Sequence, residues 1–159
     1  MAAKTEALAK QFEAKAQEAT GVLERLSDSD WKKTTASEKW TVAVVAHHMA
    51  GSHEGIANII KAVSAGQSMG NFTMQMLHDM NAKHAQEHAG ANKAETIALH
   101  KKNAATAAAV VRGLSDADLA KSGTVLSGVP PMSVEQVING ILLNHVEEHL
   151  KSIRATTNL

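Results

Sequence analysis

Residues 140–153, GILLNHVEEHLKSI, combine an apolar helical stripe with two histidines four positions apart. At about 100° per residue, His145 and His149 continue the stripe that passes through Ile138 and Leu142, and Ile153 closes it. A solvated pair would instead lie on the charged side of the same helix. The pattern therefore predicts a helix whose two histidines face inward, either as buried core imidazoles or as metal ligands at a spacing that can chelate one ion.

The rest of the chain shows the same helical pattern. Apolar residues recur at intervals of three and four in residues 8–26, and again in residues 45–63. Residues that cap helix N-termini precede the later helices. The predicted caps are Thr41, Asn92 with Glu95 three positions later, and Ser133 with Gln136 three positions later, and the last helix is expected to run to about Arg154.

Four long helices predict an all-α fold, a four-helix bundle with a long crossover connection. Gly66 and Gly70 interrupt the pattern after the second helix, and residues 72–90 are expected to form a partial helix or part of the crossover. The similar stretches LERLSDSDW and VRGLSDADL close the first and third helices, as an internal duplication or as ordinary Ser/Asp turns. Residues 1–159 are expected to form a single domain.

Composition narrows the functional classes. Sixteen basic and sixteen acidic residues cancel, and no cationic segment is present, so nucleic acid is not an expected partner. The absence of cysteine removes disulfides, thiolate metal sites and a cysteine nucleophile. No apolar run is long enough to span a membrane, and the N-terminus lacks a signal peptide core, so a cytoplasmic protein is expected. Nine histidines remain as the feature to explain.

The second helix carries three of these histidines. Taking Val45 as the centre of the apolar stripe, His48 falls about 60° to one side and His53 about 80° to the other. His47 falls about 160° away and is expected to be solvated. Metal sites in helix bundles use side chains that project inward from facing helices. His48, with His53 as the alternative, is therefore the predicted third partner of the last-helix pair.

Other histidine patterns in the chain are also candidates for a functional site. HAQEH at residues 84–88 and HVEEH at 145–149 both match H-x-x-E-H, a zinc protease pattern, but a match of five residues in a histidine-rich chain is weak evidence. His84 and His88 lie in a polar stretch without an apolar stripe and are expected to be exposed. His78 and His100 are candidates for the rim of a site.

Several motifs together resemble one family. The stretch W-T-V-x-x-V-x-x-H from Trp40 to His48 is similar to the DinB-like family, which belongs to a superfamily of metal-dependent thiol S-transferases and maleylpyruvate isomerases. DMNAKHAQE at residues 79–87, LSDADL and HVEEHLKSI follow in the same order as in that family. The resemblance implies a four-helix bundle, often dimeric, that holds a divalent metal with three histidines. Carried over to this chain, they are His48, His145 and His149.

The resemblance also implies a chemistry. Three imidazoles with an open position describe a catalytic metal, with zinc expected and nickel or iron as alternatives. Characterised relatives use a low-molecular-weight thiol, so the expected function is S-transfer or isomerisation of a small-molecule substrate by a homodimer. A non-catalytic metal-binding stress or interaction protein and a metal-dependent hydrolase are the alternatives. Candidate hydrogen-bond partners of the ligands are Glu54, Asp79, Asn144 and Glu148. Met74, Met76 and Met80 are expected in a pocket, the core or a dimer contact.

Overall fold

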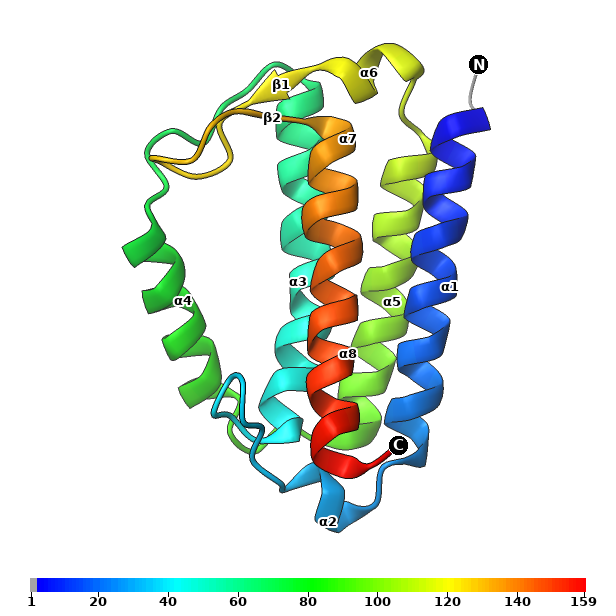
Figure 1. The fold of residues 1–159 in the computed structure, drawn as a ribbon, viewed down its shortest axis with the longest axis vertical. Coiled ribbons are helices and arrows are strands. Elements are labelled where there is room, and N and C mark those ends of the chain that lie inside the picture. Colours follow the sequence, from blue (N-terminus) through cyan, green and yellow to red (C-terminus); the bar gives the residue numbers. More distant parts are fainter. Residues whose placement is uncertain (1–2) are drawn as a thin grey trace.

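Four long helices form a bundle in the computed structural model, which describes residues 3–159 (Figure 1). Helix α5 packs against both α1 and α3, and the C-terminal helix also contacts α1 and α3. This confirms the predicted all-α bundle. The long helices are α1 (Ala3–Arg25), α3 (Val42–Ser64), α5 (Lys93–Arg112) and a last helix built from α7 (Val134–Val137), the π-helix η1 (Ile138–Leu143) and α8 (Asn144–Thr157).

The helix starts follow the predicted capping residues. The Thr41 hydroxyl accepts a hydrogen bond from the amide of Val44 and begins α3. Asn92 accepts from the Glu95 amide and begins α5. Ser133 and Gln136 form a reciprocal capping box at α7. These caps satisfy amide groups that have no partner inside the helix, so they fix where each helix begins.

The two LSD stretches prove to be helix starts as well as helix ends. Ser27 begins the short α2 (Asp28–Trp31), and Ser115 begins α6 (Asp116–Ala120). Each serine forms a capping box with an aspartate three residues later. The same local solution therefore joins α1 to α3 and α5 to the last helix. A two-residue antiparallel pair, β1 (Ser122–Gly123) with β2 (Met132–Ser133), completes the second connection.

The core lies between the four long helices. It is built by the predicted stripes. Its largest fully buried apolar side chains come from α1, α3 and the last helix, and the small alanines of α5 allow close approach. Ser52 and Ile59, which the sequence pattern also placed on the inner stripe, are only half-buried. The largest of the fully buried side chains include Phe12, Leu23, Met49, Ile60, Ile138, Leu142 and Ile153.

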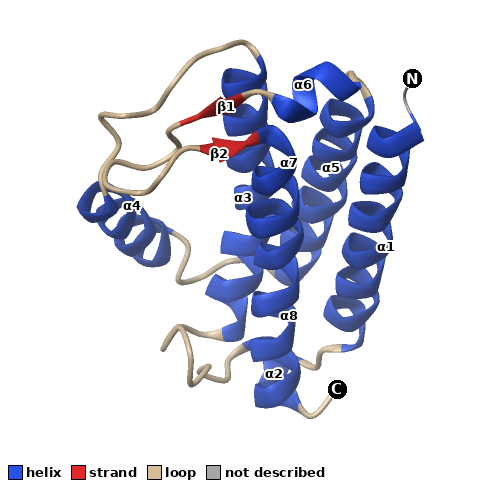
Figure 2. Ribbon diagram, turned by 45° about the horizontal axis from the view of Figure 1, so that its top comes forward, coloured by secondary structure: helices blue, strands red, loops and turns tan. Residues whose placement is uncertain are grey.

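Helix α4 (Met74–Glu87) occupies the long crossover between α3 and α5. It stands apart from the other helices at one side of the bundle (Figures 1 and 2), and its direct helix contacts are with α3. No residue of α4 is buried. Met74, Met76 and Met80 are about half exposed and so do not belong to the core. Apolar burial therefore contributes little to holding this helix in place.

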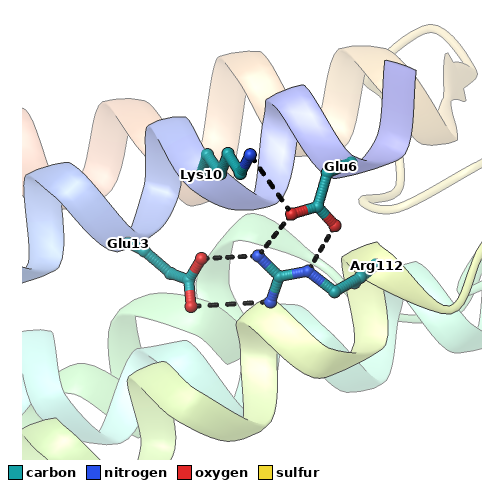
Figure 3. Close-up of polar contacts among 4 residues, drawn as sticks. All are labelled: Glu6, Lys10, Glu13 and Arg112. Atoms are coloured by element: carbon teal, nitrogen blue, oxygen red, sulfur yellow. Dashed lines mark hydrogen bonds and ion pairs between the residues drawn. The ribbon is translucent and has the colours of Figure 1, made fainter. Parts of the chain in front are cut away.

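An arginine links α1 to α5 on the outside of the bundle. The guanidinium of Arg112 donates to both carboxylate oxygens of Glu6 and to both of Glu13, with shortest distances of 2.6 Å to each residue (Figure 3). The fork of an arginine suits such paired contacts. These side chains are more than a third exposed, so their ion pairs contribute little to the free energy of folding. They nevertheless define how α1 lies relative to α5.

Within residues 3–159, none of the helices combines the length and the apolarity that a membrane crossing requires.

Candidate metal centre

The structure brings together the three histidines that the sequence predicted. His48 projects from α3, and His145 and His149 project from α8, one turn apart. The Nε2 atom of His145 lies 3.1 Å from the Nε2 atoms of both other rings. All three side chains are half-buried, and one ring nitrogen from each lies within 4.8 Å of the others. Two nitrogen ligands on a tetrahedral zinc are about 3.3 Å apart, so the spacing suits one ion.

Neighbouring side chains fix the orientation of these rings. Trp40 packs edge-on against His48, with ring centroids 5.4 Å apart, just before the cap residue that begins α3. His48 in turn meets His149 edge-on at 5.0 Å. The rings are therefore held by aromatic contacts at the end of the bundle where α3 begins.

Glu38 is the hydrogen-bond partner of His149, and sequence reasoning did not find it. The Nδ1–H group of His149 donates to Glu38 Oε2 at 2.9 Å, and the Ser152 hydroxyl donates to Glu38 Oε1 at 2.5 Å. The four candidates named from the sequence, Glu54, Asp79, Asn144 and Glu148, do not take this role. Glu38 lies 111 positions before His149 in a loop, so no helical spacing could connect them.

The loop that carries Glu38 has a defined backbone. The amide of Thr35 donates to the Trp40 carbonyl at 2.8 Å, and the amide of Lys39 donates to the Thr35 carbonyl at 3.1 Å. Lys39 adopts a left-handed conformation with φ of 61°, which few residues other than glycine and asparagine favour. This turn directs Glu38 toward α8 while it brings Trp40 next to α3.

Burial lowers the pKa of two of the three imidazoles of the triad. Desolvation, with smaller contributions from neighbouring histidines, lowers the pKa of His48 to about 4 and the pKa of His145 to about 2. Burial acts to raise the pKa of Glu38, but hydrogen bonds from Ser152 and His149 outweigh it and leave this pKa below its ordinary value. At neutral pH the site thus presents uncharged His48 and His145 rings and the Glu38 carboxylate.

The number of protons that the three Nε2 atoms can carry is consistent with a cation bound between them. If His149 donates through Nδ1 to Glu38, its Nε2 atom carries a lone pair. A single proton on His145 Nε2 can then be donated toward His48 and His149 together. The two 3.1 Å contacts have room for no second proton. A cation between the three Nε2 atoms would satisfy all three lone pairs at once. The donor set, three nitrogens with one carboxylate behind them, matches a catalytic zinc-type site.

His53 does not replace His48 in this arrangement. It is fully buried on another face of α3, where its Nε2–H donates to His100 Nδ1 at 3.0 Å. His100 is also fully buried rather than at a rim, and its Nε2–H donates to the Ala16 carbonyl at 2.9 Å. Phe12 packs edge-on against His53. The pair is a hydrogen-bonded link through the core between α1, α3 and α5.

A second histidine cluster lies on the α4 side of α3, contrary to expectation. His47, predicted to be solvated, is half-buried, and its Nδ1 lies 2.8 Å from His84 Nε2. His84 and His88, predicted to be exposed, are also half-buried. The ring of His88 stacks on that of His47 with centroids 3.9 Å apart. The apolar pattern could not show this cluster because it reports packing against a core, not contact between polar side chains.

Solved structures share this fold. Two crystal structures of a mycothiol-dependent maleylpyruvate isomerase, one of them a point mutant, superpose with TM-scores of 0.75 at 11% sequence identity, covering 94% of this chain. This chain spans 60% of the isomerase chain. YfiT from Bacillus subtilis, described as a probable metal-dependent hydrolase with an unusual four-helix bundle topology, superposes with a TM-score of 0.74 at 18% identity, covering 99% of this chain and 86% of YfiT.

Sequence comparison extends this likeness to a family. A search of curated proteins found no match. The model of the DinB superfamily, however, matches residues 11–153. That match runs from the first helix of the bundle through α3 to the end of the histidine pair on α8, so it includes all three members of the triad. With nine-tenths of its length matched and the bundle confirmed, this chain belongs to the DinB superfamily.

Proposed function

We propose that this protein is a divalent-metal-dependent enzyme whose metal is held by His48, His145 and His149. The convergence of their three Nε2 atoms, with Glu38 behind His149, carries the proposal. Nitrogen ligands suit zinc, nickel or iron, and zinc is the expected ion. When bound, such an ion lowers the pKa of a coordinated water or thiol and supplies a nucleophile at neutral pH.

The proposed reaction is transfer or isomerisation that uses a low-molecular-weight thiol. The chain contains no cysteine, so the thiol must arrive on a cosubstrate. The bundle shared with a mycothiol-dependent isomerase supports this choice, although the likeness covers 60% of that protein. Burial keeps His48 and His145 neutral, Glu38 orients His149, and Trp40 packs against His48 at one side of the site.

The alternative reaction is hydrolysis by a metal-bound hydroxide, favoured by the description of YfiT as a probable metal-dependent hydrolase. The two reactions differ in their need for a thiol. The homodimer, the single domain over residues 1–159 and the cytoplasmic location belong to the same proposal. A non-catalytic metal-binding protein is the remaining alternative, and it would bind metal without turning over any substrate.

Metal content of untagged protein tests the centre. Wild type, purified without a nickel column and dialysed, should retain a divalent metal. His48→Ala, His145→Ala and His149→Ala should each lower the metal content by about one ion per chain while helix content stays unchanged in circular dichroism. His78→Ala, an exposed histidine outside the triad, is the matched control. A wild type and a triad variant with equal metal content would refute the centre.

Thiol binding then separates the reactions. Tight binding of a low-molecular-weight thiol to the metal-loaded wild type, and its loss in His149→Ala, would support the transferase. Turnover of ester or amide substrates without any thiol would instead support the hydrolase.

A further inference from the structure

His47, His84 and His88 are brought together by two helices that make few other contacts. His47 comes from α3, and His84 and His88 come from α4, one turn apart. One ring nitrogen from each lies within 4.8 Å of the others. The 2.8 Å between His47 Nδ1 and His84 Nε2 is about 0.5 Å shorter than the separation of two nitrogen ligands on zinc. A small movement of exposed α4 would supply this difference.

This second cluster repeats the construction of the first triad. In each, α3 contributes one histidine and a facing helix contributes two at positions i and i+4. His47 and His48 are consecutive, so their side chains diverge by about 100° around α3. His48 therefore faces α8, and His47 faces α4. The rings of His48 and His84 have centroids only 5.7 Å apart, so the two triads are neighbours.

The polar atoms of the cluster are incompletely paired. Two neutral imidazoles can share one proton between His47 and His84, but His84 Nδ1 has no hydrogen-bond partner and is shielded from solvent. The ring of His88 lies nearly parallel to that of His47, at an interplanar angle of 18°, so these two rings stack face to face. A cation bound at His84 Nε2 would keep the proton on Nδ1, and His88 would have to turn out of its stack to reach the same ion, so the case for a site rests on the convergence of the three rings.

We propose that His47, His84 and His88 form a second site for a zinc-type divalent cation, next to the centre formed by His48, His145 and His149. Nitrogen-only ligation again selects zinc, nickel or copper over magnesium or calcium. Glu87, one residue from His88 and close enough to influence His84 electrostatically, offers a carboxylate at the rim. The proposal does not depend on the reaction assigned to the first centre.

The second ion would hold α4 against the bundle. This helix buries no side chain, so its attachment rests on few contacts beyond the histidines. A metal bridging His47 to His84 and His88 would link α4 to α3 directly. Metal binding should therefore slow amide exchange in residues 74–87 more than in the rest of the molecule.

Two cations in adjacent triads repel each other, and the carboxylates of Glu38 and Glu87 offset this repulsion only in part. The second site should accordingly bind its ion more tightly when the first triad is disabled. Each bound ion should lower the affinity of the other site, and unrelated surface histidines would not show this mutual effect.

Zinc stoichiometry tests the proposal. Untagged wild type is loaded with Zn²⁺, dialysed against metal-free buffer and analysed for metal. Two ions per chain are expected in wild type, one in His84→Gln/His88→Gln and one in His145→Ala/His149→Ala. The variant with all four substitutions should bind none, and His78→Gln, a histidine on α4 outside the cluster, should bind two.

Hydrogen exchange of the same proteins gives an independent result. Zn²⁺ should slow exchange in residues 74–87 of wild type and of His145→Ala/His149→Ala, but not of His84→Gln/His88→Gln. The second site is refuted if His84→Gln/His88→Gln retains as much zinc as wild type, whatever that amount is. If only the first centre is absent, wild type should bind one ion, and His84→Gln/His88→Gln should bind none.

Discussion

Among residues 3–159, Glu38 is the carboxylate that hydrogen-bonds to the histidine triad. It accepts hydrogen bonds from His149 and from Ser152, and these bonds hold one tautomer of His149 with its Nε2 lone pair directed at the other rings. Partners of this type raise the basicity of the ligand and fix its orientation. Glu38 is therefore a positioning residue, and its contribution should appear in metal affinity.

Glu38→Gln should weaken zinc binding by about 10- to 100-fold without loss of helix content, because the amide keeps an acceptor but loses the charge. Competition with a chromophoric chelator measures the affinity. Glu148→Gln is the matched control, since Glu148 is exposed and next to the same histidine in sequence. Equal zinc affinity in the two variants would show that Glu38 has no positioning role.

The buried pair His53 and His100 should make the free energy of unfolding of the metal-free protein depend on pH. Burial, followed by the neighbouring His100, lowers the pKa of His53 to about 3, and burial also lowers the pKa of His100. The unfolded chain binds protons near the ordinary value of about 6.5. Their contribution to stability is therefore complete above that value and is lost as pH falls, by at most about 1.4 kcal/mol per pH unit for each histidine.

Urea unfolding between pH 7.5 and pH 4.5 measures this slope. His53→Met/His100→Gln removes both titrating groups, and glutamine can still donate to the Ala16 carbonyl that His100 contacts. The free energy of unfolding of this variant should fall less steeply below pH 6.5 than that of wild type, whatever its value at pH 7.5. Parallel slopes would mean that the pair takes up protons in the folded protein as readily as in the unfolded chain, and would contradict the lowered pKa values of the buried rings.

At the scale of the helices, the C-terminal helix shows which inward-facing residues a constant helical angle predicts and which it misses. A uniform 100° per residue correctly placed His145 and His149 on the inner side. The same rule puts Ile141, four residues before His145, on the buried stripe, yet Ile141 is only half-buried. Val146 and Leu150 flank the histidines in the core instead. The wider turns of the π-helix Ile138–Leu143 change the angular phase. Apolar periodicity carries no mark of such a segment, although π-helical turns often occur beside functional sites.

Helix α4 was predicted only in part, for a different reason. Its sequence has no apolar stripe, so residues 72–90 were expected to be a partial helix or a connection with exposed histidines. Thr73 nevertheless caps a 14-residue helix, and His84 and His88 contact His47. The position of this helix depends on polar contacts between segments far apart in sequence. Such contacts follow from the assembled bundle and cannot be read from local spacing.

Considered as a whole molecule, the bundle forms its core independently of the histidine triad. The apolar stripes that predicted the fold also bury side chains along the full length of the four helices. The triad lies at one end of this core and is half-buried. A small zinc-dependent fold that lacks a core unfolds without its metal. This bundle should not, because a bound ion adds to a stability that hydrophobic burial already provides.

Removal of metal should therefore lower the melting temperature without unfolding the protein. At free Zn²⁺ about 100-fold above the dissociation constant, binding at one site adds about 2.7 kcal/mol. For a domain of this size that corresponds to roughly 5–10 °C. Thermal scans by circular dichroism, with chelator and with added zinc, measure the shift. His145→Ala/His149→Ala should lose the part that arises from the triad. Loss of helix content on chelation at 25 °C would show that the fold needs its metal, and would contradict the expectation that hydrophobic burial alone maintains the bundle.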